Sequence, residues 1–316
     1  MKDQFLKDVI KGLSAADKYL LPKYFYNKRG DEIFSEIMDC DDYYLTRAET
    51  EIFKNQSNKI VELLQGDTKI NVVELGPGDM TKSVFLINEL EKRSLLSQFY
   101  PVDISVNIIT KLQSWLPEIF PGISVNGICG DYMQSLSGKD FPLNIPKLVL
   151  FLGANIGNYN RCEVNVVLRK ICSLLNYGDM VLIGFDLKKH PEKILKAYND
   201  SEGLTKEFNL NLLSRINFEL GGNFELKNFE HYASYNPQSG ECKSYLIATK
   251  DHSITIAGKR FYFKKYEPIF MEVSNKYSLE EIHEFEKIHG FKKLNYFSDS
   301  ANLFTDVLWQ FIPPHQ

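Results

Sequence analysis

The spacing of apolar residues changes several times along the chain. Residues 5–20 carry apolar side chains at helical spacing, and Leu21-Pro22 predicts the end of that helix. Residues 22–48 mix aromatic and charged side chains, which indicates a structured connector. From about residue 56, short apolar runs alternate with amphipathic segments. The predicted strands are 70–76, 98–103, 123–128, 146–153 and 179–187, with helices at 80–92, 105–115 and 161–176. This alternation predicts a parallel, doubly wound sheet that is covered on both faces.

The pattern changes after Asp186. Residues 191–218 have the spacing of a helix, and residues 224–274 are dense in short alternating runs separated by turn residues. The predicted strands there are 224–229, 244–249, 253–257, 260–264 and 269–274. A helix over 278–289 is predicted next, with Ser278 and Glu281 as a capping box, and then strands 292–297 and 304–312. We therefore expect an inserted antiparallel unit and a closing β-hairpin.

The first strand of the alternating region runs straight into a glycine turn. Gly76 and Gly78 follow the apolar run Val72-Val73-Glu74-Leu75, and the second strand ends on Asp103. A glycine turn lets the backbone approach a ligand without a Cβ clash, and a carboxylate at the next strand end can accept from a ribose diol. The pattern therefore predicts an adenosine site.

The details of the turn disfavour a dinucleotide. A pyrophosphate site requires G-x-G-x-x-G, but Thr81 occupies the third glycine position, and Pro77 has no backbone N–H to donate. A ligand without phosphate fits better, and S-adenosylmethionine is the common one. An ordinary strand-to-helix turn with two glycines and a nucleotide-linked oxidoreductase are the alternatives at this point.

Composition sets outer limits on the function. Hydrophobic residues make up 44% and charged residues 25% of the 316 residues, as in ordinary globular proteins. The 37 Lys and Arg against 41 Asp and Glu give a net charge of −4, which provides no electrostatic case for a nucleic-acid or membrane partner. No apolar run approaches the ~18 residues of a membrane helix, and the N-terminus is unlike a signal peptide.

Cysteine and histidine patterns indicate a reduced protein without a metal. The five cysteines are widely spaced and form no C-x-x-C, so a cytoplasmic location is expected. His283-Glu284 resembles the start of H-E-x-x-H, but Lys287 stands at the fifth position. We therefore expect no metal site, and we expect a monomer that acts on a small molecule.

Several local motifs together resemble one family. They are Tyr24-Phe25-Tyr26-Asn27-Lys28-Arg29-Gly30-Asp31-Glu32-Ile33-Phe34, Asp42-Tyr43-Tyr44-Leu45-Thr46-Arg47-Ala48-Glu49, Phe151-Leu152-Gly153-Ala154-Asn155-Ile156-Gly157-Asn158, Ala197-Tyr198-Asn199-Asp200, Phe208-Asn209-Leu210-Asn211 and Glu272-Val273-Ser274. From about residue 20 to the end, the chain resembles the histidine-specific, S-adenosylmethionine-dependent N-methyltransferases of ergothioneine biosynthesis. The order and spacing of the motifs are kept.

The resemblance implies an enzyme with defined site residues. The cofactor contacts would be Gly76, Lys82, Asp103, Asp131 and Tyr132, with Asp103 on the ribose and the last two at the adenine. Tyr26, Asn158 and Tyr198 would fix the α-carboxylate and amine of the substrate and form the catalytic set. Phe34, Tyr43 and Gly153 would shape the substrate pocket, and Glu272 and Ser274 would bind the imidazole. Pro77 stands where the family often has a small polar residue, which removes a side-chain contact but leaves the backbone turn.

The residues themselves support part of this assignment. Asn158 follows the fourth strand, at the edge where α/β sheets bind ligands, although a turn-forming role after Gly157 is the plain alternative. Glu272 and Ser274 share one face of a strand and could clasp both imidazole nitrogens, or they could form a solvated face. The tyrosines could be core aromatics, since the chain has 17 of them.

The sequence thus predicts an α/β protein with a class I, Rossmann-like methyltransferase core and an inserted α+β substrate-binding domain. The core is expected over 56–190 and 277–316, and the substrate-binding domain over 1–55 and 191–276. The predicted reaction is methylation of the α-amino group of L-histidine, which by the resemblance proceeds to Nα,Nα,Nα-trimethylhistidine. The alternatives are a relative that methylates another amino acid, such as a tryptophan derivative, a nucleotide-linked oxidoreductase, and a non-catalytic adenosine-binding module.

Overall fold

The chain forms two compact units, each assembled from two separate segments. The computed structural model describes residues 2–64 and 68–313. The sheet unit consists of Leu45–Lys188 and Asn275–Gln316, and the second unit consists of Met1–Tyr44 and Lys189–Ser274. Each unit has its own apolar core.

The sheet unit is built on seven strands in the order β11-β12-β5-β4-β1-β2-β3. The strands are β1 (Ile70–Leu75), β2 (Leu96–Asp103), β3 (Ile128–Cys129), β4 (Lys147–Phe151), β5 (Met180–Asp186), β11 (Phe291–Ser298) and β12 (Phe304–Phe311). The first five run parallel, whereas β12 pairs antiparallel with both β5 and β11. The predicted doubly wound sheet with a closing hairpin is therefore confirmed.

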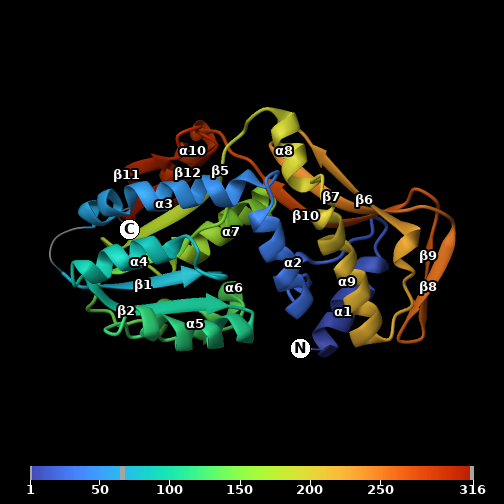
Figure 1. Cartoon of the computed structure of the whole chain (residues 1–316), viewed down its shortest axis with the longest axis horizontal. Helices are drawn as coiled ribbons and strands as arrows, with labels where there is room; N and C mark the ends of the chain where they lie inside the picture. Colours follow the sequence, from blue (N-terminus) through green and yellow to red (C-terminus); the bar gives the residue numbers. More distant parts are fainter. Residues whose placement is uncertain (1, 65–67, 314–316) are drawn as a thin grey trace. The chain divides into compact units, whose positions relative to one another are not determined.

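Helices accompany these strands, and those from α4 to α7 lie in the chain between β1 and β5 (Figure 1). They are α3 (Tyr44–Leu63), α4 (Ser83–Lys92), α5 (Val106–Ile119), the short α6 (Tyr132–Ser135), α7 (Arg161–Cys172) and α10 (Leu279–His289). All six residues of β1 are buried, as expected for a parallel strand that is covered on both faces. The predicted capping box of α10 is present, since Glu281 N–H donates to the Ser278 hydroxyl and Ser278 N–H to the Glu281 carboxylate.

The second unit combines helices with two small sheets. Its helices are α1 (Lys2–Leu13), α2 (Lys28–Asp39), α8 (Pro191–Tyr198) and α9 (Leu204–Leu220), and α1 and α2 both pack against α9 (Figure 1). Strands β10 (Pro268–Asn275), β7 (Glu241–Ala248) and β6 (Phe229–Tyr235) form one sheet, and β8 (His252–Ile256) pairs with β9 (Lys259–Phe263). The apolar sides of the helices and strands share one core, which includes Phe208, Leu246 and Met271.

Several local expectations differ from the structure. The helix expected over 5–20 ends early, because α1 stops at Leu13. The connector 22–48 contains α2, whose first turn begins where the Asn27 side chain accepts from Gly30 N–H. The helix expected over 191–218 is divided in two, because the Asp200 carboxylate accepts from Leu204 and Thr205 N–H and starts α9 anew. The strand expected over 224–229 is mostly a 3₁₀ turn, Leu226–Asn228, and the strand expected over 123–128 is reduced to Ile128–Cys129.

The boundaries of the two units differ from the expected ones, most clearly at the first. It lies after Tyr44 rather than after residue 55, because nearly all of α3 belongs to the sheet unit. Ala48, Ile52 and Phe53 of α3 are buried, and the Gln56 side chain donates to the Ser298 carbonyl. The other two boundaries lie after Lys188 and Ser274, close to the expected positions.

Candidate cofactor and substrate sites

The glycine turn after β1 has the backbone conformation that requires glycine. Gly76 and Gly78 have φ values of +70° and +55°, in the left-handed region. A Cβ on Gly76 would lie 3.2 Å from the Asn155 amide nitrogen, so the loop after β4 comes close to the turn. The turn therefore places two half-buried glycines at the carboxyl edge of the sheet, where ligands bind in this class of fold.

Asp103 ends β2, the strand next to β1. Its carboxylate accepts from Ser105 N–H at 2.8 Å, and backbone N–H groups of Gly78 and Ile104 also donate to it. Burial raises the pKa of Asp103, while these hydrogen bonds act against the shift. The glycine turn and the Asp103 carboxylate thus lie together, as an adenosine site requires.

Asp131 and Tyr132 follow β3 and begin α6. The Asp131 carboxylate accepts from Met133 N–H at 2.9 Å, and Gly130 N–H donates to the Asp103 carbonyl at 2.9 Å. The Tyr132 hydroxyl shares a 2.7 Å hydrogen bond with the Tyr159 hydroxyl. Burial, followed by the neighbouring Tyr159, raises the pKa of Tyr132 well above its ordinary value. Tyr132 therefore remains a neutral aromatic surface beside Asp103.

Lys82 lies against the backbone of Gly153. The Lys82 ammonium pairs with the Glu49 carboxylate at 2.5 Å, and Gly153 N–H donates to the same carboxylate at 2.8 and 3.1 Å. Gly153 has φ +72°, and a Cβ there would lie 3.3 Å from Lys82 Nζ. Burial lowers the pKa of Lys82, but the charge of Glu49 and the hydrogen bond to it outweigh burial and raise it. The structure thus joins Lys82, expected on the cofactor, to Gly153, expected on the substrate.

Two further buried acids lie in this region, and sequence reasoning missed both of them together with Glu49. Burial raises the pKa of Glu74 to about 8 and the pKa of Asp306 well above its ordinary value. A signal was available for Glu74, because it is the single charged residue of a wholly buried strand. Asp306 similarly interrupts the buried strand β12.

In the second unit, Tyr198 and Ser274 are in direct contact. The Tyr198 hydroxyl donates to the Ser274 hydroxyl at 2.7 Å, and the ring of Tyr43 meets the ring of Tyr198 edge-on at 6.2 Å. The Tyr198 carbonyl bonds His231 Nε2 at 2.8 Å, which joins the end of α8 to β6. Three of the expected substrate residues therefore belong to one cluster.

Tyr26 and Phe34 form a second aromatic group. Their rings meet edge-on at 5.7 Å, and both also contact Phe208 of α9 at 5.7 Å. Tyr26 is 37% exposed, so its ring edge can reach a ligand. Tyr26 and Phe34 thus share contacts with Phe208, and Phe34 is partly buried against the core of the second unit.

Strand β10 presents Glu272 and Ser274 on one face. Ile269 and Met271 point the other way and are buried in the core of the second unit. The Glu272 side chain is half-buried, and Ser274 is buried beside Tyr198. A carboxylate and a hydroxyl are therefore presented side by side at the end of this strand.

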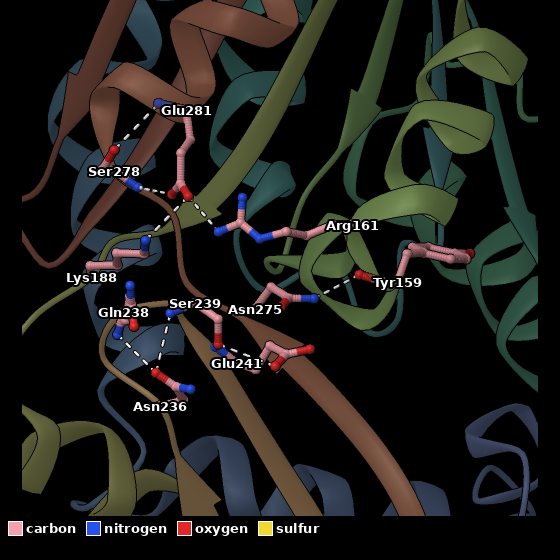
Figure 2. Close-up of polar contacts among 10 residues, drawn as sticks. All are labelled: Tyr159, Arg161, Lys188, Asn236, Gln238, Ser239, Glu241, Asn275, Ser278 and Glu281. Carbon is pink, nitrogen blue, oxygen red and sulfur yellow. Dashed lines mark hydrogen bonds and ion pairs between the residues drawn. The ribbon is translucent and has the colours of Figure 1, made fainter.

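Asn158 ends the 3₁₀ turn Asn155–Asn158 in the sheet unit and is exposed. The amide of Asn275 donates to the carbonyls on both sides of it, Gly157 at 3.1 Å and Tyr159 at 2.6 Å, the second of which Figure 2 shows. The loop that carries Asn158 is therefore held from both flanks, which leaves the Asn158 side chain at the sheet edge.

The remaining contacts in Figure 2 are structural. The Glu281 carboxylate accepts a hydrogen bond from Ser278 N–H and forms ion pairs with Arg161 and Lys188. These contacts tie α10 to α7 and to the end of β5. Asn236 and Glu241 organise a tight turn between β6 and β7. Neither group contains a residue that the sequence assigned to a site.

The expected site residues are divided between the units. Gly76, Lys82, Asp103, Asp131, Tyr132, Gly153 and Asn158 belong to the sheet unit, and Tyr26, Phe34, Tyr43, Tyr198, Glu272 and Ser274 belong to the second unit. Over residues 2–64 and 68–313, no group of three or more His, Cys, Asp or Glu side chains could hold a metal ion. Among the same described residues, no helix is long and apolar enough to cross a membrane.

The sheet topology and the site at its carboxyl edge define a class I methyltransferase that uses S-adenosylmethionine. The glycine turn, the Asp103 carboxylate and the paired Lys82 fit a cofactor with a ribose diol and an amino-acid end. The profile of the family described as histidine-specific, SAM-dependent methyltransferases matches residues 5–311, and the chain belongs to that family. It is therefore an enzyme with a small-molecule amino-acid substrate.

Individual relatives show the same assignment. The chain is 34% identical over 278 residues to the histidine N-alpha-methyltransferase of Mycolicibacterium smegmatis, covering 87% of this chain and 85% of the relative. It is 32% identical to ergothioneine biosynthesis protein 1 of Schizosaccharomyces pombe, covering 82% of this chain and 34% of that protein. The L-tryptophan methyltransferase of Psilocybe serbica is 28% identical, covering 81% of this chain and 78% of the relative. The oxidoreductase and the non-catalytic module are thereby excluded.

Proposed function

We propose that this protein methylates the α-amino group of L-histidine and yields trimethylhistidine in ergothioneine biosynthesis. The observation that carries this proposal is the placement of Glu272 and Ser274 on one face of β10, with Ser274 bonded to Tyr198. A carboxylate accepts from an imidazole N–H, and a hydroxyl that accepts from Tyr198 can donate to the second ring nitrogen. The pair is therefore complementary to an imidazole.

When bound, S-adenosylmethionine supplies a reactive sulfonium methyl group for an SN2 transfer. The residues of the chain then have to orient the amine and remove its proton, since only the free amine attacks. We assign Asn158 to the carboxylate and amine of the substrate, and Tyr26 and Tyr198 to the amine. α-Amino groups titrate near ~8, so partial deprotonation at neutral pH needs little help. Phe34, Tyr43 and Gly153 exclude water from the substrate.

The cofactor contacts follow the geometry of the sheet edge. We assign Asp103 to the ribose hydroxyls, Asp131 and Tyr132 to the adenine, and Gly76 and Lys82 to the remainder of the cofactor. The closeness of Asp103 to the glycine turn supports this assignment. The segments 1–44 and 189–274 then form the substrate-binding part and the sheet unit forms the cofactor-binding part.

A tryptophan derivative is the second candidate substrate, because a relative is named as an L-tryptophan methyltransferase. An indole has one N–H donor and no acceptor nitrogen, so it leaves one of the two polar groups on β10 without a ligand partner. Glu272 together with Ser274 therefore favours histidine.

The test is Glu272→Ala, measured by competition between histidine and tryptophan. Losing the carboxylate leaves an imidazole N–H without an acceptor, which costs about 1–3 kcal/mol of binding free energy. The kcat/KM for histidine should therefore fall roughly 10- to 100-fold. Activity on tryptophan should fall much less, and cofactor binding should stay unchanged. Glu230→Ala, an exposed glutamate on β6 of the same sheet, is the matched control. Equal losses on both substrates would contradict the assignment of Glu272.

The assembly and location are also proposals. We infer a monomer in the cytoplasm without a nucleic-acid or membrane partner, supported by the net charge of −4 and by five free cysteines. Light scattering during size-exclusion chromatography tests the monomer, since a dimer would have a measured mass of twice the 36.5 kDa of the chain.

A further inference from the structure

The carboxylate of Glu49 lies at the centre of a buried polar cluster beside the glycine loops. Glu49 belongs to α3 and is 1% exposed. It accepts from the Lys82 ammonium at 2.5 Å and from Gly153 N–H at 2.8 and 3.1 Å. One carboxylate thus connects a helix, the turn after β1 and the loop after β4.

The sheet has room for this carboxylate because of a glycine. A Cβ on Gly184 of β5 would lie 2.5 Å from Glu49 Oε1, which real Cβ contacts do not allow. Asp306 of β12 stands opposite Gly184 in the antiparallel register and is fully buried. Glu49 therefore rests over the point where β5 and β12 meet.

The cluster contains more carboxyl groups than ammonium groups. Glu49, Glu74 and Asp306 face Lys82, and all three acids are at most 3% exposed. Burial raises the pKa of Glu74 to about 8 and the pKa of Asp306 well above its ordinary value. Glu49 is the acid that pairs with Lys82, since its carboxylate lies 2.5 Å from the ammonium and also accepts from Gly153 N–H.

We propose that Glu49 is a positioning residue that, held by the Gly153 amide, fixes the Lys82 ammonium for the amino-acid end of the cofactor. The α-carboxylate is the one anionic group of S-adenosylmethionine, so an ammonium at this edge is its complement. Ordering a free lysine side chain costs rotamer entropy, and a preformed contact removes that cost from binding. The inference rests on the proposed assignment of Lys82 to the cofactor.

The experiment compares two cofactor analogues by calorimetry. S-adenosylhomocysteine carries the amino-acid end, whereas methylthioadenosine keeps the adenosine but lacks both carboxylate and amine. Glu49→Gln should raise the Kd of S-adenosylhomocysteine roughly 10- to 100-fold, the range for a lost charged hydrogen bond. It should leave the Kd of methylthioadenosine within about 2-fold. Glu62→Gln, an exposed glutamate of the same helix, should change neither.

A second variant, Glu49→Asp, keeps the test possible if Glu49→Gln does not fold. Glu49→Asp keeps the charge but shortens the side chain by one methylene. It should raise the Kd of S-adenosylhomocysteine, but not that of methylthioadenosine, by a smaller factor than Glu49→Gln does. Equal weakening of both analogues would make Glu49 merely structural, and unchanged binding would remove its role. If the wild type binds neither analogue, the proposed cofactor site fails instead.

Discussion

The two units hold their expected site residues by different physical means. In the sheet unit, the contacts are charged and buried: Glu49 with Lys82, and Asp103 with backbone N–H groups. In the second unit, the contacts of Tyr26 with Phe34 and of Tyr198 with Ser274 are aromatic or neutral, and Glu272 adds one carboxylate. The charged set suits a zwitterionic ligand with a ribose, and the neutral set suits a ring and a free amine.

The difference also concerns how each residue is positioned. Gly76 and Asp103 stand at the ends of neighbouring strands, so sheet pairing brings them together. Tyr43, Tyr198 and Ser274 come from a loop, a helix end and a strand, and only packing brings them together. We therefore expect larger losses from single changes on the charged side than on the neutral side.

The largest effect is expected at Asp103. Asp103→Ala should weaken the binding of S-adenosylmethionine by about 1.5–3 kcal/mol, the range for hydrogen bonds to a charged group. Asp103→Asn keeps an acceptor oxygen and should lose less affinity. Calorimetry measures the change, and Glu118→Ala, an exposed acid of α5, is the control. Unchanged affinity in a folded Asp103→Ala variant would refute the ribose assignment.

A slightly smaller effect is expected at Asn275. Asn275→Ala removes the donor that serves the Gly157 and Tyr159 carbonyls, and an unpaired buried acceptor costs about 1–3 kcal/mol. Denaturant unfolding should show this loss, and the KM for histidine should rise because the loop of Asn158 is released. Asn295→Ala, an exposed residue of β11, should change neither quantity. A destabilised variant with normal KM would separate Asn158 from substrate binding.

A modest effect is expected at Tyr198. Tyr198→Phe removes one neutral hydrogen bond to Ser274, worth about 0.5–1.5 kcal/mol, so kcat/KM for histidine should fall roughly 2- to 12-fold. Tyr262→Phe on the exposed side of β9 serves as control. If the free-energy loss of Tyr198→Phe in kcat/KM equals the loss of Asp103→Ala in cofactor binding, the neutral contacts contribute as much as the charged ones.

The last effect lies outside this order of binding effects, because it is a pH dependence of stability caused by Glu74. Burial raises its pKa from 4.5 to about 8, so between these values the folded protein holds a proton that the unfolded chain releases. The contribution to stability is complete below pH ~4.5 and is lost as the pH rises through ~8. Glu74→Gln should therefore gain stability relative to the wild type as the pH rises from 5 to 8. Parallel unfolding midpoints of the cofactor-free proteins across that range would exclude this contribution.

Much of the fold and part of the site could be predicted from local pattern. The alternation of apolar runs identified the strands of the sheet, and Ser278 with Glu281 identified the start of α10. Gly76 and Asp103 were recognisable because a left-handed turn and a strand-end carboxylate are both local features. The division of 191–218 was missed because Asp200 acts through two hydrogen bonds rather than through the apolar pattern.

The sequence by itself determined the class of sheet, the glycine turn and the family, because these depend on residues that are near one another in the chain or kept in order along it. Only the tertiary structure decided that Glu49 pairs with Lys82, 33 residues away along the chain, and with Gly153, 104 residues away. It also decided that Asp306 and Glu74 are buried beside them. The physical reason is that burial and charge pairing depend on which distant segments pack together, and no local pattern records that.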